Sequence, residues 1–382
     1  MSFQPIPFAF PLLTILTTLA ALMAVGCAAE QAARPTQAPA LTPTATSEPA
    51  PTPTPVPLVF LPADEAPHDT PIEWWYFNGM LRDEAGREYG YHYVTFQTEG
   101  APGVAPHLLQ ATLGDHGRGV HYAAETGVLA PENPEARGVD VEAGGWLMRA
   151  GPKGYDMRFH FDEGEGPVAL ELRAVPRRGP VLHGGTGLVH MGPEAGSTYY
   201  YSRTRLHVTG WIEDAGGRRV VSGPGWMDHQ WGEIASGRIG WDWASIQFDD
   251  GADLMAAVVW SPDGRRRLSG HGTYIEPGGE VTYMEGDDVS IVAQGEWTSP
   301  DTGVAYPMGW QVKIDSLDLE VELTPYLRQA ESTSDFLGVS YWEGAVSVSG
   351  LLGGNPATGW GFVELVGYDP RQLEVTPPAP MP

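Results

Sequence analysis

From Leu58 onward, the chain consists of short β-prone runs separated by turn residues. Residues 72–79, 91–96 and 240–248 are rich in aromatic and β-branched side chains, whereas residues 249–251 and 262–264 read Asp-Asp-Gly and Pro-Asp-Gly. No run in this region has the i, i+3, i+4, i+7 apolar spacing of an amphipathic helix. The 49 glycines and 35 prolines supply residues for many turns. The pattern therefore predicts an all-β protein.

The spacing of strands and turns repeats in the two halves of this region. Two antiparallel barrels of roughly 150 residues each explain the repeat better than one large sheet. We predict one barrel domain over residues 58–232 and a second over residues 233–372. A Pro-rich tail follows over residues 373–382, and we expect it to be disordered.

The N-terminal region has the pattern of an exported protein. Residues 8–26 are almost entirely apolar and end at Cys27, the sole cysteine, after the small residues Ala-Val-Gly. This resembles a bacterial lipobox, so we predict a signal peptide over residues 1–27 and lipidation of Cys27; an uncleaved anchor is the alternative. Residues 28–57 form a Pro/Thr-rich tether that reaches about 70 Å if extended. Either alternative predicts an extracytoplasmic protein, membrane-anchored or secreted.

Charge and motifs exclude several functions. The net charge of −26 would repel nucleic acid and anionic lipid surfaces. The chain has no Gly-x-Ser-x-Gly, phosphate-loop, dinucleotide-binding or His-Glu-x-x-His motif, and its 11 histidines lack the close spacing of metal ligands. A single cysteine allows no internal disulfide. We therefore predict no cofactor and no metal.

The stretch 222–232, Ser-Gly-Pro-Gly-Trp-Met-Asp-His-Gln-Trp-Gly, brings a carboxylate, an imidazole and two indoles together directly after Gly-Pro-Gly, which predicts a turn. Asp228 and His229 are residue types that transfer protons near neutral pH. Glu73 opens an apolar aromatic run, so we expect burial to raise its pKa and keep it a neutral acid. We predict these three as catalytic residues. Indoles that could wall an apolar pocket and stabilise a cation are Trp74, Trp75, Trp226, Trp231, Trp241 and Trp243.

An acid, a base that holds water and aromatic walls suit the addition of water to an alkene. The same residues suit a binding pocket without turnover. In a third alternative they are structural, and the tyrosine- and arginine-rich face of residues 199–211 contacts a partner. The opposite face of that strand is expected to be core and carries Tyr200, Ser202, Thr204, Leu206, Val208 and Ile212.

Several blocks resemble the carotenoid 1,2-hydratase and AttH-like family. They are residues 73–79 (Glu-Trp-Trp-Tyr-Phe-Asn-Gly), 199–205, 225–232 (Gly-Trp-Met-Asp-His-Gln-Trp-Gly), 241–243, 341–344 and 359–368, in the family's order. The resemblance implies tandem lipocalin-like barrels with the block at 225–232 near their junction. It also implies that His229 and Trp231 correspond to a His and a Trp of the hydratases. Those enzymes use a Tyr-x-Asp pair where this chain has Val-Trp-Ser-Pro-Asp, residues 259–263.

The resemblance implies action on, or binding of, a hydrophobic small molecule such as a lipid or isoprenoid. Hydration of a carbon–carbon double bond, or a related lyase or hydrolase-like step, is the expected chemistry. A non-catalytic ligand-binding or surface-interaction lipoprotein is the alternative.

Overall fold

The computed structural model describes residues 56–373 apart from Pro134, Glu194, residues 235–238, Pro262 and Arg265. Cys27, the predicted signal peptide and nearly all of the predicted tether and tail lie outside this part. Within it, every helix is a 3-10 helix of three or four residues: η1 (Ala63–Glu65), η2 (His183–Gly185), η3 (Gly286–Asp288), η4 (Asp315–Leu317) and η5 (Pro370–Leu373). None of these helices is long and apolar enough to cross a membrane.

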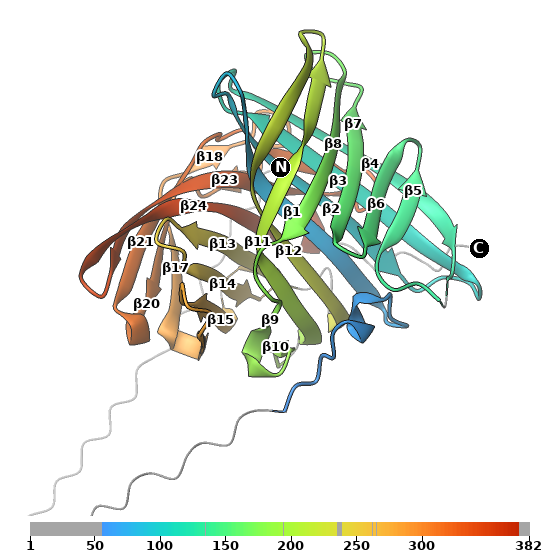
Figure 1. Cartoon of the computed structure of the whole chain (residues 1–382). Coiled ribbons are helices and arrows are strands. Elements are labelled where there is room, and N and C mark those ends of the chain that lie inside the picture. The colour runs from blue at the N-terminus through green and yellow to red at the C-terminus, as the bar shows by residue number, and fades with distance from the viewer. Residues whose placement is uncertain are drawn as a thin grey trace, which may run out of the picture. The chain divides into compact units, whose positions relative to one another are not determined.

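The first half of this region forms one antiparallel sheet, coloured blue to yellow-green in Figure 1. Its strand order is β4-β3-β2-β1-β12-β11-β8-β7-β6-β5, and β9 and β10 pair with β11 beside this path. The strands are β1 (Ile72–Asp83), β2 (Glu88–Thr98), β3 (Val104–Asp115), β4 (Val120–Pro131), β5 (Asp140–Ala143), β6 (Trp146–Gly151), β7 (Gly154–Phe161), β8 (Val168–Pro176), β9 (Val181–Leu182), β10 (Leu188–Gly192), β11 (Gly196–Asp214) and β12 (Gly217–Ile234).

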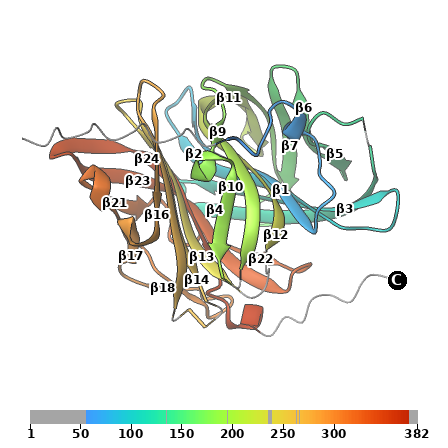
Figure 2. The ribbon, with the colours of Figure 1, turned by 90° about the horizontal axis from the view of Figure 1, so that it is seen from below.

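The second half forms another antiparallel sheet, coloured yellow to red (Figures 1 and 2), in the order β16-β15-β14-β13-β24-β23-β21-β20-β17, with β22 paired to β23. Its strands are β13 (Gly240–Phe248), β14 (Asp253–Trp260), β15 (Arg267–Ile275), β16 (Val281–Glu285), β17 (Val289–Ala293), β20 (Trp310–Ile314), β21 (Leu319–Pro325), β22 (Glu331–Ser334), β23 (Val339–Leu352) and β24 (Asn355–Val366). A small ribbon joins β18 (Trp297–Thr298) and β19 (Ala305–Tyr306). The predicted all-β fold with two antiparallel barrels in tandem is confirmed.

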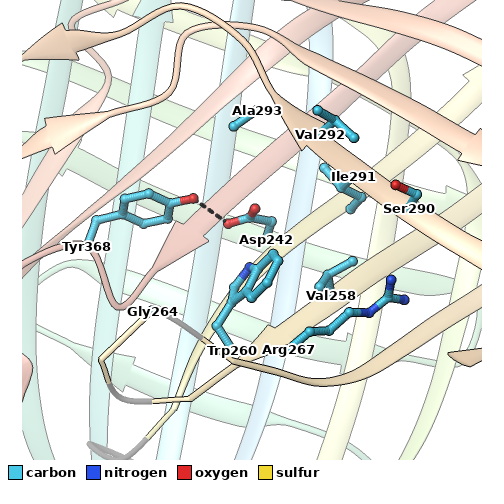
Figure 3. Close-up of a pocket in the computed structure, with 10 residues that line it drawn as sticks. All are labelled: Asp242, Val258, Trp260, Gly264, Arg267, Ser290, Ile291, Val292, Ala293 and Tyr368. Carbon is cyan, nitrogen blue, oxygen red and sulfur yellow. Dashed lines mark hydrogen bonds between the residues drawn. The ribbon is translucent and has the colours of Figure 1, made fainter. Parts of the chain in front are cut away.

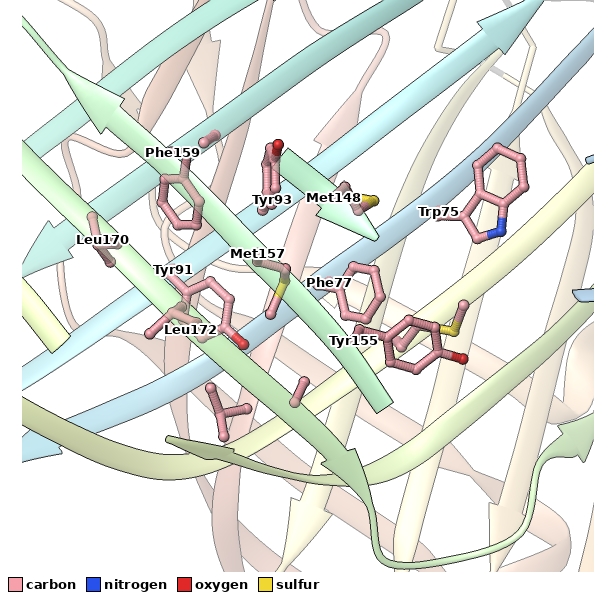
Figure 4. Close-up of a cluster of buried hydrophobic side chains, with 14 of the residues drawn as sticks. Trp75, Phe77, Tyr91, Tyr93, Met148, Tyr155, Met157, Phe159, Leu170 and Leu172 are labelled. Atoms are coloured by element: carbon pink, nitrogen blue, oxygen red, sulfur yellow. The ribbon is translucent and has the colours of Figure 1, made fainter. Parts of the chain in front are cut away.

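Each sheet encloses its own apolar core, because alternate residues of a strand point to opposite faces. In the first, Tyr93 packs against Phe159 and Phe77 packs against Tyr155, and Trp75 belongs to the same cluster (Figure 4). Trp310 and Trp342 belong to the core of the second. A third cluster contains residues of both sheets, namely Tyr76, Val94, Val189, Tyr200, Trp226, Trp243 and Met255. We call it the junction cluster.

The long strand β11 changes faces part-way. Its pairing with β12 shifts register between Arg203 and Leu206, as at a β-bulge, where an extra residue reverses the alternation. Before the shift, Tyr200 belongs to the junction cluster; after it, Leu206 and Val208 belong to the first core. The expectation that one face runs unbroken from Tyr200 to Ile212 was therefore wrong, and a bulge between the two halves is the reason.

Candidate functional site

Strand β12 carries the central block and lies between β1 and β11 in the first sheet. The register places Glu73 opposite Trp231, and Trp75 and Tyr201 opposite His229. The block is thus continuous strand through its Gly-Pro-Gly sequence and not a turn. Three segments that are far apart in sequence meet at His229 because of this pairing.

On the face of the first sheet that points into its barrel, Glu73 of β1 contacts two imidazoles. His229 Nε2 lies 2.6 Å from Glu73 Oε1, and His68 Nδ1 lies 2.7 Å from the same oxygen. The backbone N–H of His68 donates to Glu73 Oε2 over 2.8 Å. We call His68, Glu73 and His229, together with Trp231, the imidazole–carboxylate centre.

Stacked rings hold this centre in place. The His68 imidazole lies parallel to the Trp231 indole, with ring centroids 4.0 Å apart, and Tyr199 stacks with the same indole. Glu73 and His229 have no exposed surface, whereas the His68 side chain is 23% exposed. His68 is therefore the member of the centre that a molecule from solvent reaches first. Sequence reasoning missed His68, which lies in the irregular segment before β1.

The protonation of the centre differs from the sequence-based expectation. Burial alone would raise the pKa of Glu73, but hydrogen bonds with His229 and His68 outweigh this effect, so the pKa is lowered. The expectation of a neutral Glu73 was therefore wrong. Burial lowers the pKa of His229 despite the opposing effect of Glu73. An ionised Glu73 beside a neutral His229 fits a tautomer whose Nε2–H donates to Glu73 and whose Nδ1 accepts from the Tyr201 hydroxyl at 3.2 Å.

The same three side chains offer one metal-ligand atom each, all within 4.8 Å of one another. Two imidazoles and a carboxylate are a common zinc donor set. However, ligand atoms of a tetrahedral zinc shell lie roughly 3.3 Å apart, from Zn–N bonds of about 2.05 Å. The imidazole nitrogens here lie only 2.6 and 2.7 Å from Glu73 Oε1. These are hydrogen-bond distances, and a metal would have to push the groups apart.

Asp228 lies on the opposite face of β12 from His229, in the region between the sheets. Its carboxylate accepts hydrogen bonds from Tyr200 Oη (2.7 Å), Trp226 Nε1 (2.6 Å) and Ser202 Oγ. Although these bonds lower the pKa of Asp228, burial dominates and raises it to about 6. The three predicted catalytic residues therefore do not converge. Glu73 and His229 meet, and Asp228 belongs to a separate network.

That network reaches the second sheet through His183. His183 Nε2 lies 2.6 Å from Ser202 Oγ, and its Nδ1 lies 2.8 Å from Thr273 Oγ1 on β15. Another buried acid lies between the sheets, since His92 Nδ1 lies 2.6 Å from Glu343 Oε2. Burial raises the pKa of Glu343 well above its ordinary value. The Asp228 and Glu343 groups link the two barrels.

The six predicted wall tryptophans fall into two groups instead of one pocket. Trp75 and Trp231 belong to the first core. The other four lie in or against the junction cluster: Trp74, Trp226, Trp241 and Trp243. Alternation along β1 and β12 separates them, because neighbouring residues of a strand face opposite sides.

Tandem antiparallel barrels that share buried polar groups at their junction define the class of two-barrel, lipocalin-like proteins. The sequence matches the AttH-like family over residues 52–368, and the chain belongs to that family. The family resemblance read from the sequence is thereby confirmed. No curated protein sequence matches this chain.

The solved structures that are similar to this chain include two with TM-scores above 0.6. One is a protein from Nitrosomonas europaea assigned to AttH, with 28% sequence identity, a TM-score of 0.71 and coverage of 83% of this chain and 98% of that chain. The other is kievitone hydratase from Nectria haematococca, with 18% identity, a TM-score of 0.67 and coverage of 81% of this chain and 93% of that chain. At that identity the second similarity concerns the fold.

Proposed function

We propose that this protein adds water to a carbon–carbon double bond of a hydrophobic small molecule, such as a lipid or an isoprenoid. The observation that carries the proposal is Glu73 held between a solvent-facing and a buried imidazole, at 2.7 and 2.6 Å. A carboxylate that bridges two imidazoles can hold a proton at either ring for transfer. A hydratase is among the proteins that share this fold.

In this proposal His68 touches the substrate. Its Nδ1 is bound to Glu73, which leaves Nε2 directed away from that carboxylate, 3.8 Å from Asp64 Oδ1. Protonated Nε2 gives its proton to one alkene carbon, and the π electrons form the new C–H bond. Water then bonds to the resulting cation and returns a proton to Nε2, so that atoms and charge balance. The ionised Glu73 stabilises the imidazolium.

The other members of the centre act through His68. His229 donates to Glu73 and fixes the orientation of its carboxylate, as a positioning residue. The Trp231 indole stacks with two rings, those of His68 and Tyr199. An indole stacked in this way holds the imidazole and is not free to cover a cation, so Tyr199, which is 36% exposed, provides the aromatic surface beside the substrate.

The test is hydration of isoprenoid alkenes in H₂¹⁸O by the full chain, with mass spectrometry of the products. We expect an ¹⁸O-labelled alcohol, and a loss of about 100-fold or more in rate for His68→Ala. The matched control is His190→Ala, which removes an exposed histidine bonded to Ser197 elsewhere on the first sheet. An isoprenoid that co-purifies with the wild type without any labelled product would instead support binding without turnover.

We further propose that Cys27 is lipidated and anchors the barrels outside the cytoplasmic membrane. The apolar run, the small residues before Cys27 and the Pro/Thr-rich stretch after it support this location. In a bacterial host, we expect labelled palmitate in the membrane-bound wild type and none in Cys27→Ser. Unlabelled wild type in the membrane would indicate an uncleaved anchor, and soluble wild type would contradict anchoring.

A further inference from the structure

The second barrel contains a pocket of about 430 Å³ that is separate from the imidazole–carboxylate centre. Its walls include Asp242, Val258, Trp260, Arg267, Ile291 and Tyr368 (Figure 3). The volume falls within the roughly 300 to 1,000 Å³ of small-molecule sites. Among the described residues, only those of the second barrel line this pocket.

The pocket lies where the second sheet is not closed by hydrogen bonds. Strands β16 and β17 end the order of this sheet, so no ladder joins β17 to β14 or β15 within the described residues. Val258 and Trp260 of β14 and Arg267 of β15 line the pocket together with Ile291 of β17. The open seam of the barrel gives a ligand access to this mainly apolar wall.

One acid marks the polar end of the pocket. Asp242 is 2% exposed and accepts a hydrogen bond from the Tyr368 hydroxyl over 2.8 Å, and the Trp260 side chain also hydrogen-bonds to it. Burial raises the pKa of Asp242 to about 6, so the group is mostly a carboxylate at neutral pH. A carboxylate with unused lone pairs accepts a hydrogen bond from a ligand hydroxyl and repels a ligand carboxylate.

Arg267 does not turn the pocket into an anion site. Its Nη2 donates to the backbone oxygens of Gly286 and Val289, over 2.5 and 2.6 Å. Figure 3 shows its guanidinium at the end of the pocket away from Tyr368. The guanidinium is therefore held against the backbone of the second barrel, while its positive charge opposes a cationic ligand. A neutral ligand is therefore compatible with Asp242 at one end of the pocket and with Arg267 at the other.

We propose that this pocket binds a neutral apolar molecule of roughly ten to fifteen carbons whose hydroxyl group donates to Asp242. The proposal does not depend on catalysis at the imidazole–carboxylate centre. An isoprenoid alcohol and a fatty alcohol share the required chemistry. Competition between geraniol and 1-decanol distinguishes these two classes of alcohol. Both compete for the same site, and the shape of the pocket decides which binds more tightly.

The test is calorimetric titration of the full chain at pH 7.5 with geraniol, geranylamine and geranic acid, which share one skeleton. We expect geraniol to bind best, with geranic acid at least about tenfold weaker. Asp242→Asn should weaken geraniol binding by about tenfold. Ala293→Phe should abolish the binding of geraniol in the second barrel, because Ala293 lines the pocket at an exposed position, where a phenyl ring fills the pocket without displacing the core.

His190→Ala serves as the control, because it removes an exposed histidine of the first sheet outside both sites, and it should bind geraniol in the second barrel like the wild type. If Asp242→Asn does not fold, the exposed Ala293→Phe variant still decides. Unchanged geraniol binding by Ala293→Phe would overturn the proposal. Tighter binding of geranic acid than of geraniol, or no binding of any of the three, would overturn it as well.

Discussion

Replacement of Glu73 by Gln tests the centre most directly, because three hydrogen bonds end on this buried carboxylate. A Gln keeps one carbonyl oxygen, which can still accept from the two imidazoles, but it places an NH₂ group opposite the backbone N–H of His68. Hydrogen bonds to a charged group contribute about 1.5–3 kcal/mol each, and an unpaired buried donor costs about 1–3 kcal/mol. We therefore expect Glu73→Gln to lower the free energy of unfolding by roughly 2–4 kcal/mol at pH 7.

The cost of Glu73→Gln should also depend on pH in a particular way. The folded pKa of Glu73 is below its ordinary value of 4.5, so its contribution is present above that pH and is lost as pH falls through the folded pKa. The folded pKa of His229 is below 6.5, so the folded state loses stability as pH falls below 6.5. Without the carboxylate the pKa of His229 falls further, and this loss grows. The stability gap between wild type and Glu73→Gln should therefore widen once pH falls below the folded pKa of His229, and it should narrow again once pH falls below that of Glu73.

The matched control is Glu331→Gln in the second barrel. Glu331 accepts hydrogen bonds from the hydroxyls of Ser299, Thr302 and Tyr306, so the variant loses a carboxylate without an imidazole among these partners. Urea unfolding followed by tryptophan fluorescence at pH 7, 5 and 4 gives the gap for each variant. A Glu73→Gln gap below about 1 kcal/mol at pH 7, or one that changes as little from pH 7 to pH 4 as that of Glu331→Gln, would refute the reasoning.

Three further predictions concern other parts of the molecule. The pKa of Asp228 rises from 3.8 to about 6 on folding, so the folded state disfavours the ionised carboxylate. The free energy of unfolding therefore falls as pH rises from 4 to 6. Relative to Asp228→Asn, the wild type should lose about 2 kcal/mol between pH 4 and pH 6, since 1.36 kcal/mol per pKa unit gives the full loss of about 3 kcal/mol only well outside both pKa values. A constant difference in urea unfolding would contradict this. A Cβ on Gly223 would lie 1.8 Å from the Met80 carbonyl oxygen, so Gly223→Ala should lower the free energy of unfolding by roughly 3 kcal/mol or more. Gly179→Ala is the control and should not lower it, because nothing lies within 4 Å of the added Cβ. Equal melting temperatures of the two variants would refute the contact. Because the imidazoles lie at hydrogen-bond distance from Glu73, titration with Co²⁺ should give no absorption band of tetrahedral Co²⁺ at one equivalent. A strong band that disappears in His68→Ala would show a metal site instead.

The sequence predicted the fold class because strand periodicity and turn residues are local signals. It also predicted that Glu73 and His229 are important, and antiparallel pairing of β1 with β12 brings them together. The grouping of Asp228 with His229 failed for a physical reason. Gly-Pro-Gly before the block indicated a turn, but the chain continues as a strand, and adjacent residues of a strand point to opposite faces.

Other features of the site depend on contacts that no local pattern carries. His68 reaches Glu73 from an irregular segment, and only the folded chain shows that a carboxylate in an apolar run has two imidazole partners. The direction of the pKa shift of Glu73 follows from those partners and not from burial. In β11, a bulge between Arg203 and Leu206 reverses a face pattern that the sequence presents as unbroken.

Strand β12 contributes side chains to two regions of the protein, and this affects how variants of residues 225–232 are interpreted. His229 and Trp231 point into the first barrel, whereas Trp226 and Asp228 point to the region between the sheets. A substitution at Asp228 disturbs contacts between the barrels and can lower activity by moving β12, without any part in proton transfer. His68 precedes β1 and is partly exposed, so its removal leaves the strand pairing intact. A rate loss in a folded His68→Ala variant therefore assigns chemistry to the centre, and the same loss in Asp228→Asn does not.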